Sequence, residues 1–237
     1  MQQSAFAFMG FNGFGPLLLY GTWLTLKLAL FSLCLSLILG VVGAQAKLST
    51  VRILRICAQI YTTLIRGVPD LLLMLLIFYG LQSAVSQVTT RMGWAYMDID
   101  AFSAGVITLG FIYGAYFTET FRGALLAIPP GQIEAGRAFG MTPAQCFCQV
   151  IFPQMMHFAL PGLGNNWLVL LKATALVSII GLADLVKVAN DAGKSSYQLF
   201  YFLLLAALIY LLIAMASNVI LYLLERRFGR GVRGPQT

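Results

Sequence analysis

Charged residues are scarce in this sequence. Only 15 Lys and Arg and 8 Asp and Glu occur among 237 residues, so 10% of the chain is charged while 59% is hydrophobic. Because soluble globular proteins carry about 25% charged residues, this composition excludes a soluble enzyme and a disordered chain. It indicates an integral membrane protein.

Residues that build catalytic sites are also few. His157 is the only histidine, and the sequence contains no His-Glu-x-x-His and no Gly-x-Ser-x-Gly pattern, so metalloprotease and serine hydrolase chemistry lack their residues. Gly193-Lys194-Ser195 resembles the end of a phosphate-binding loop, but Val188 stands where the first glycine is required. We therefore expect no catalytic residue and no nucleotide bound by this chain.

The cysteines do not form a metal or disulfide framework. Their spacing lacks the second pair or the histidine partners of a zinc site, and we interpret them as packing residues: Cys34, Cys57, Cys146 and Cys148. We expect no metal and no cofactor in this chain.

Long apolar stretches dominate the rest of the sequence. Each approaches or exceeds the roughly 20 residues that a transmembrane helix needs, and none shows the alternation of a membrane β-barrel strand. We predict one all-α transmembrane domain over residues 1–237. Its five spans are expected at about 16–43, 59–85, 102–128, 159–182 and 197–224.

Basic residues gather on one side of this five-span arrangement. The positive-inside rule makes that side cytoplasmic, with the N-terminus outside and the C-terminus inside. Ten basic residues lie there against Asp70, Glu134 and Glu225: Lys47, Arg52, Arg55, Arg66, Arg122, Arg137, Arg226, Arg227, Arg230 and Arg233.

A polar segment, 129–153, separates the third and fourth spans. Pro129-Pro130 ends one helix, while Gly140 suits a C-cap and Thr142-Pro143 suits an N-cap followed by proline at the first helical position. We expect Pro153 to stop the second piece. The segment is therefore predicted to be a pair of short helices that project at the cytoplasmic face.

The motifs of this segment resemble the EAA loop of ATP-binding-cassette (ABC) importer permeases. That loop reads Glu-Ala-Ala, a Gly, and later Ile-x-Leu-Pro, and this chain has Glu134-Ala135-Gly136, Gly140 and Val150-Ile151-Phe152-Pro153. Gly136, Val150 and Phe152 depart from the pattern but keep its small or apolar character.

Three further stretches resemble the polar amino-acid (HisMQ) subfamily of these permeases. They are Tyr61 to Pro69, Gly114 to Gly123 and Leu160 to Trp167. Within the subfamily the motifs are particularly similar to permeases of histidine/lysine/arginine/ornithine importers, with opine permeases nearby.

The resemblance implies a type I importer fold and a non-catalytic permease subunit in a bacterial inner membrane. It would move histidine, arginine, lysine, ornithine or an opine inward. The implied partners are a HisM-like second permease, two copies of a HisP-like ATPase that binds ATP and Mg, a periplasmic amino-acid-binding protein and the lipid membrane. No nucleic acid is implied. The ATPase-coupling residues would be Glu134, Ala135, Gly136 and Gly140.

Charges within the spans are the candidates for handling substrate, because each costs about 2.5–3.5 kcal/mol at a helix centre on insertion scales. Glu119, with Tyr113, Tyr116 and Thr120 nearby, could accept a charge-assisted hydrogen bond from a cationic amino acid. A local ion pair with Arg122, three residues further on, explains the same carboxylate equally well.

Two other groups complete the candidate residues. Lys172 in the fourth span could receive an α-carboxylate or brace the interface between permeases. Its predicted neighbours along the substrate pathway are Asn165, Asn166, Trp167, Thr174 and Ser178. At the entry to the second span, Arg66, Pro69 and Asp70 are predicted to fix a turn and an ion pair, and a substrate gate is the alternative.

Two other classes of protein compete with the importer. An ion-coupled secondary carrier could use Glu119 as its proton site, but such carriers usually contain two matching halves, which five spans do not provide. A membrane scaffold or sensor would not need Glu119 and Lys172 within its spans.

Overall fold

The computed structural model describes residues 13–95 and 97–229, and every regular element in these ranges is a helix. In chain order these are α2 (Gly15–Leu48), α3 (Arg52–Gly67), α4 (Asp70–Arg91), α5 (Ala101–Leu126), α6 (Pro130–Ala138), α7 (Pro143–Cys146), a π-helical turn (Phe147–Ile151), α8 (Phe152–Ala173), a 3₁₀ segment (Thr174–Ile180), α9 (Leu185–Ser195) and α10 (Leu199–Gly229).

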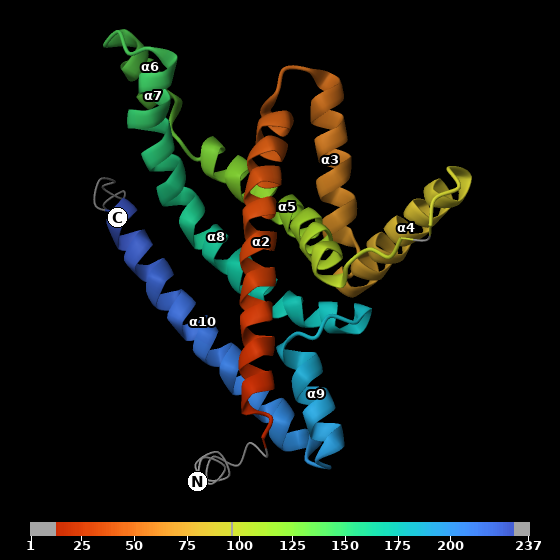
Figure 1. Ribbon diagram of the computed structural model, residues 1–237. Helices are drawn as coiled ribbons and strands as arrows, with labels where there is room; N and C mark the ends of the chain where they lie inside the picture. Colours follow the sequence, from red (N-terminus) through yellow and green to blue (C-terminus); the bar gives the residue numbers. More distant parts are fainter. Residues whose placement is uncertain (1–12, 96, 230–237) are drawn as a thin grey trace.

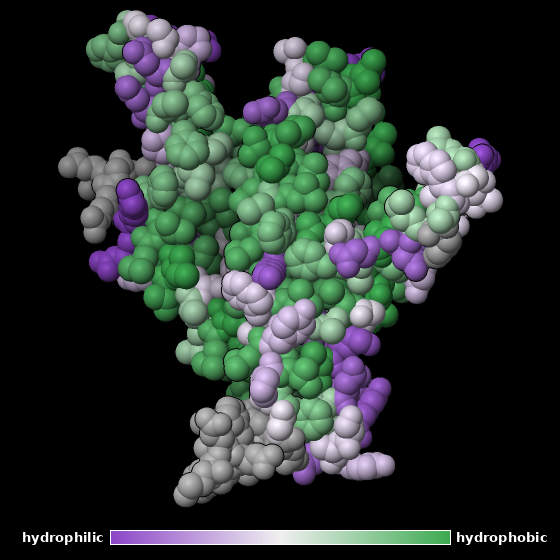
Figure 2. Space-filling model, viewed as in Figure 1, coloured by the Kyte–Doolittle hydropathy of each residue, from purple (hydrophilic) through white to green (hydrophobic). Residues whose placement is uncertain are grey.

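Five helices of this described part are long and apolar enough to cross a membrane. They are Gly15–Leu48, Asp70–Arg91, Ala101–Leu126, the continuous stretch Pro143–Ile180, and Leu199–Phe228. Figure 2 shows apolar side chains over most of the middle of the visible face, with hydrophilic residues concentrated toward α6 and α7, α9 and the far end of α4. The prediction of an all-α, multi-pass membrane protein is confirmed.

Helices α2 and α5 form the centre of the fold, and they run in the same direction (Figure 1). Gly40 packs so closely on α5 that an added Cβ would lie 2.6 Å from Phe117 Cβ, and Gly110 packs equally closely against Leu35. Ser36 Oγ donates a hydrogen bond to the Gly110 carbonyl at 3.3 Å. Small residues allow membrane helices this close approach, and we call this contact the α2–α5 seam.

Helices α8 and α10 complete the bundle. Asn166 on α8 contacts Thr120 on α5, whereas Gly105, earlier on α5, approaches Val177, later in the chain. Thus α8 runs opposite to α5. The start of α2 and the start of α10 lie beside α9, and the α6–α7 pair lies at the opposite end (Figure 1). We call these the α9 end and the α6 end.

The second predicted span requires correction. Residues 59–85 are not one helix, because α3 ends at Gly67 and α4 begins at Asp70. Val68 is extended, with φ −111° and ψ 142°, which is the conformation that the ring of a following proline favours. The spanning helix is α4, while α3 is a separate amphipathic helix.

The segment between the third and fourth spans follows the predicted caps but not the predicted end. Gly140 has φ +76° after α6, and Thr142 forms a capping box with Gln145 at the start of α7. Pro153, however, does not stop the helix. The π turn before α8 brings this proline into the first turn of α8, where its missing N–H costs little, so the helix continues to Ile180 rather than restarting near 159.

Helix α9 lies between the predicted fourth span, 159–182, and the predicted fifth span, 197–224. Asp184 caps it by accepting a hydrogen bond from the Lys187 amide at 2.9 Å. Leu185, Ala189 and Ala192 are buried toward α2 and α10. The α9 end is therefore closed by a packed helix.

Candidate functional site: a polar cavity toward the α6 end

A polar cavity opens between α2, α3 and α5. Its volume is about 440 Å³, which lies within the range of small-molecule sites, roughly 300–1,000 Å³. The residues that line it are Lys47, Gln59, Thr62, Thr63, Arg66, Gly67, Tyr116, Glu119 and Arg122. Its α3 wall is the polar side of an amphipathic helix, so the sequence of α3 directs these side chains toward one surface.

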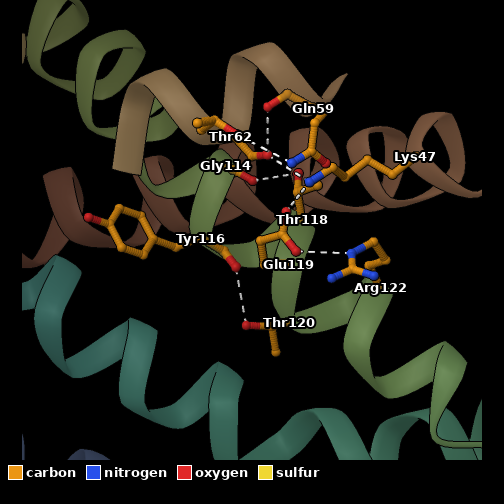
Figure 3. Close-up of polar contacts among 10 residues, drawn as sticks. Lys47, Gln59, Thr62, Gly114, Tyr116, Thr118, Glu119, Thr120 and Arg122 are labelled. Atoms are coloured by element: carbon orange, nitrogen blue, oxygen red, sulfur yellow. Dashed lines mark hydrogen bonds and ion pairs between the residues drawn. The ribbon is translucent and has the colours of Figure 1, made fainter. Parts of the chain in front are cut away.

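Glu119 is the centre of the charged part of this cavity (Figure 3). Lys47 Nζ donates to Glu119 Oε1 and also to Thr62 Oγ1 at 2.7 Å. Arg122 Nε donates to Glu119 Oε2 at 2.9 Å. Both carboxylate oxygens are therefore engaged. The ion pair with Arg122 that the sequence indicated is present, and Lys47 adds a second one.

Burial makes the contact between Lys47 and Glu119 energetically important. Only 4% of the Lys47 side chain and 17% of the Glu119 side chain are exposed. A buried ammonium group needs a charged or hydrogen-bonding partner, and Glu119 and Thr62 supply both. The contact joins α2 and its neighbour α3 to α5, and Glu119 lies 72 residues after Lys47 in the sequence.

A second polar group continues from the cavity to the start of α4. The Arg66 guanidinium lies over the Tyr116 ring, 5.5 Å from its centroid, and Tyr116 stacks on Tyr113. Tyr113 Oη donates to Asp70 Oδ2 at 2.9 Å.

The predicted ion pair between Arg66 and Asp70 is absent, since the ion pairs found in the described ranges are those of Glu119. The chain break at Val68 and Pro69 explains the difference. It leaves Arg66 on α3 and places Asp70 in the first turn of α4, beside Tyr113.

The residues of α8 that were predicted to handle substrate do not line this cavity. Asn166 Nδ2 donates to Thr120 Oγ1 at 3.0 Å, and Trp167 lines an apolar groove of about 300 Å³ between α2, α5, α8 and α10. Asn165 and Lys172 are exposed.

Further along the same chain segment, the polar side chains bond locally. Thr174 Oγ1 donates to the Leu171 carbonyl at 2.7 Å and lies 3.2 Å from Tyr210 Oη. Ser178 Oγ donates to the Ala175 carbonyl at 2.7 Å. The predicted pathway residues thus do not form one site. Tyr116 and Glu119 line the polar cavity, Trp167 lines the apolar groove, and Thr174 and Ser178 bond to carbonyls of their own segment.

The residues predicted to couple to an ATPase lie together at the α6 end. Glu134 and Ala135 are exposed on α6, while Gly136 is buried, with Cys146 Sγ 3.2 Å from where a Cβ would stand. This close contact gives a packing reason for glycine in place of alanine. Gly140 ends the helix in the left-handed conformation.

Lys47 is the main residue that sequence reasoning missed, because it was counted only as an orientation signal. A local pattern could have identified it. Ser36, Gly40, Gly43 and Lys47 recur at intervals of four, three and four residues, so all four share one helix face. A lysine that continues a stripe of small residues is expected to face another helix rather than solvent.

The fold and the site define a class. A multi-pass helical membrane protein with a polar cavity among its spans and a capped, exposed short helix at one end has the form of a transport permease. A model of the family described as "Binding-protein-dependent transport system inner membrane component" matches residues 32–230, and the chain belongs to this family. It is a non-catalytic membrane subunit of an ABC importer, which decides against the secondary carrier.

Individual relatives narrow the comparison. The chain is 58% identical over 221 residues to the histidine/lysine/arginine/ornithine transport system permease protein HisQ of Salmonella typhimurium, covering 93% of this chain and 97% of the relative. It is 40% identical to the octopine transport system permease protein OccQ of Rhizobium radiobacter, covering 95% and 96%. A solved structure described as the crystal structure of an amino acid ABC transporter with histidines matches with a TM-score of 0.78 and 35% identity, covering 93% and 98%. The predicted HisQ-like subfamily and the type I importer fold are confirmed.

Proposed function

We propose that this chain is the permease subunit of an importer for basic or polar amino acids, namely histidine, lysine, arginine, ornithine or an opine, in a bacterial inner membrane. The similarity to HisQ over nearly the full length of both chains carries the proposal. The whole chain forms one transmembrane domain, with the α9 end outside and the α6 end in the cytoplasm. The excess of basic residues toward the α6 end supports this orientation.

The assembly we infer contains a HisM-like second permease, two copies of a HisP-like ATPase and a periplasmic amino-acid-binding protein. The apolar, weakly buried surfaces of α4 and α10 are available for lipid and for the second permease. ATP and Mg bind to the ATPase, and no nucleic acid takes part.

Transmission from the ATPase acts through α6. Glu134, Ala135, Gly136 and Gly140 are the coupling residues, and the exposure of the first two supports this role. In a variant whose native cysteines are replaced by serine, Ala135→Cys is expected to form a disulfide with a cysteine in the ATPase groove in a nucleotide-dependent manner. Cysteine at Lys194, on α9, serves as the control and is expected to form none. Labelling of Ala135→Cys from the periplasm would contradict the orientation.

The function itself is tested with the purified complex in lipid vesicles. We expect the binding protein loaded with histidine, arginine, lysine or ornithine to stimulate ATP hydrolysis and uptake, because HisQ-type similarity extends along the whole chain. Isolation of the intact chain from native membranes without an ATPase or a second permease would contradict the importer. Stimulation by glutamate alone would contradict the substrate class.

The four amino acids share their α-amino and α-carboxylate groups, and each side chain also carries a basic nitrogen. Their side chains range from an imidazole to a guanidinium, while the α-amino and α-carboxylate groups are the same. A permease that serves all of them can recognise the identical α-groups whatever the shape of the side chain.

A further inference from the structure

We propose that the polar cavity binds the α-carboxylate of the transported amino acid through Arg66 and Arg122, and that Glu119 does not contact the substrate's side chain. The inference rests on the proposed function and specifies which part of the substrate this site recognises. It also replaces the expectation that Glu119 attracts a cationic side chain.

The charge balance of the cavity gives the first argument. Three cations line it, Lys47, Arg66 and Arg122, against the single anion Glu119. Because the net charge is positive, a cationic side chain would be repelled here, whereas a carboxylate would be attracted.

The hydrogen bonds of Glu119 give the second argument. One of its oxygens accepts from Lys47 and the other from Arg122. A substrate cation would have to displace Lys47, whose side chain is only 4% exposed, and leave that ammonium buried without its partner. Removing one member of a buried pair costs about 3–5 kcal/mol, so this exchange is unfavourable.

Unused guanidinium groups give the third argument. Arg122 engages Glu119 through Nε, which leaves its two terminal nitrogens available. Arg66 forms no ion pair within the described ranges, and its guanidinium lies over the face of the Tyr116 ring. The N–H edge of Arg66 therefore has no acidic partner within those ranges. An edge of this kind matches the two oxygens of a carboxylate.

The rest of the cavity suits the remainder of an amino acid. Gln59 lines the cavity and its Nε2 donates to Thr63 Oγ1 at 3.3 Å, while its side-chain Oε1 can accept a hydrogen bond from an α-ammonium group. In the part of the chain that the structure describes, Glu119 is the one acid that lines the cavity, so no further carboxylate there selects a particular side chain. Such a site binds the groups that all amino acids share and leaves discrimination among side chains to another component of the transporter.

The test measures equilibrium binding to the permease and ATPase complex in nanodiscs without the binding protein, so that the binding protein's own preference does not enter. The probes are arginine, argininamide, in which the carboxylate is a neutral amide, and citrulline, in which the side chain is neutral. We expect argininamide to bind at least about tenfold more weakly than arginine, and citrulline to bind within about threefold of arginine.

Two variants and a control assign the effect to residues. Arg66→Gln is expected to weaken binding of arginine about tenfold without changing binding of argininamide, and Arg66→Lys is expected to restore only part of the loss because an ammonium lacks the guanidinium edge. Lys27→Gln removes an exposed cation outside the cavity and should leave the ratio unchanged.

Equal binding of arginine and argininamide, or a loss with citrulline larger than that with argininamide, would overturn the inference, as would absence of arginine binding at millimolar concentration. The proposed function is judged separately, by uptake and by stimulation of ATP hydrolysis.

Discussion

The two ends of α2 treat buried charge in opposite ways. At the α6 end, Lys47 and Glu119 face each other and neutralise each other's charge. At the α9 end, Asp184 is 0% exposed, and its Oδ1 accepts from the Lys187 amide while its Oδ2 has no hydrogen-bond partner among the described residues. Burial consequently raises the pKa of Asp184 from 3.8 to about 6, against backbone hydrogen bonds that lower it.

This difference separates two uses of a charged side chain. The ion pair joins α2 to α5, and Lys47 also donates a hydrogen bond to Thr62 on α3. The pair stabilises the fold only as long as both charged partners remain. Asp184 forms no ion pair within the described ranges and serves instead as the N-cap of α9. Its second carboxylate oxygen is buried without a hydrogen bond, which lowers the stability gained from the cap. The following predictions test this contrast, from the largest expected effect to the smallest.

Breaking the ion pair is expected to have the largest effect. Glu119→Gln leaves Lys47 charged and buried without an anion, so we expect a loss of about 3–5 kcal/mol in stability. The double variant Lys47→Met/Glu119→Gln should recover much of the loss, because neither charge remains buried. Thermal unfolding of the complex measures both, with Lys27→Met, an exposed lysine on the same helix, as the control. Equal losses in the single and double variants would show that the two residues are not coupled.

Acidification should affect the α9 end. A carboxyl group whose pKa is raised on folding destabilises the folded state when it ionises, so stability is highest below about pH 4 and falls as the pH rises through about 6. The difference amounts to at most about 3 kcal/mol. Asp184→Ser keeps an N-cap residue and should reduce the rise in melting temperature between pH 7 and pH 5. Asp191→Ser, on the exposed side of α9, is the control and should retain that rise.

The α2–α5 seam is expected to tolerate little added volume near the ion pair. A Cβ at Gly43 would overlap Thr118 Oγ1, which is buried and donates to the Gly114 carbonyl at 2.8 Å. We expect Gly43→Ala to destabilise by about 1–3 kcal/mol. Gly123→Ala on α5, where no atom lies within 4 Å, should be neutral or stabilising. Equal changes in melting temperature for the two substitutions would show that close packing at Gly43 does not contribute to stability beside the ion pair.

The end of α6 should give the smallest effect. Alanine at Gly140 would have to adopt φ +76°, which costs about 1–2 kcal/mol for a residue with a Cβ. We expect this cost to appear locally, as faster hydrogen exchange of the α6 amides and weaker coupling of ATP hydrolysis to transport. Gly131→Ala in the first turn of α6, with nothing within 4 Å, should leave both unchanged.

Much of the fold follows from the sequence because it depends on local properties. Long apolar runs identify the spans, and the caps at Gly140 and Thr142 depend on neighbouring residues only. The turn at Arg66 to Asp70 was predicted, and the chain does break there. The second span was nevertheless started at residue 59, because Val68 and Pro69 lie in a stretch whose average hydropathy is that of a span. The effect of Pro153 was overestimated because a π turn can bring a proline into a helix without ending it.

The site was harder to predict because its contacts link distant residues. Glu119 was identified by its charge alone, and Arg122 by its spacing of three residues. Lys47 lies 72 positions before Glu119, and no local pattern specifies their pairing. The stripe from Ser36 to Lys47 reveals only that this lysine faces a helix. Identifying that helix requires the packing of α2 on α5.

The α2–α5 seam also has a mechanical consequence. Only three residues separate the end of α5 from α6, and α5 is packed against α2 from Leu28 to Lys47. We therefore expect α2 and α5 to move as one rigid unit if α6 is displaced. The far end of this unit lies where Gly21 packs against the backbone of Asp184 and Leu185. The break between α3 and α4, at Val68 and Pro69, is not part of this packed pair of helices. We thus expect movement of α6 at one side of the membrane to reach α9 at the other side, while the chain bends beside the cavity at Val68 and Pro69.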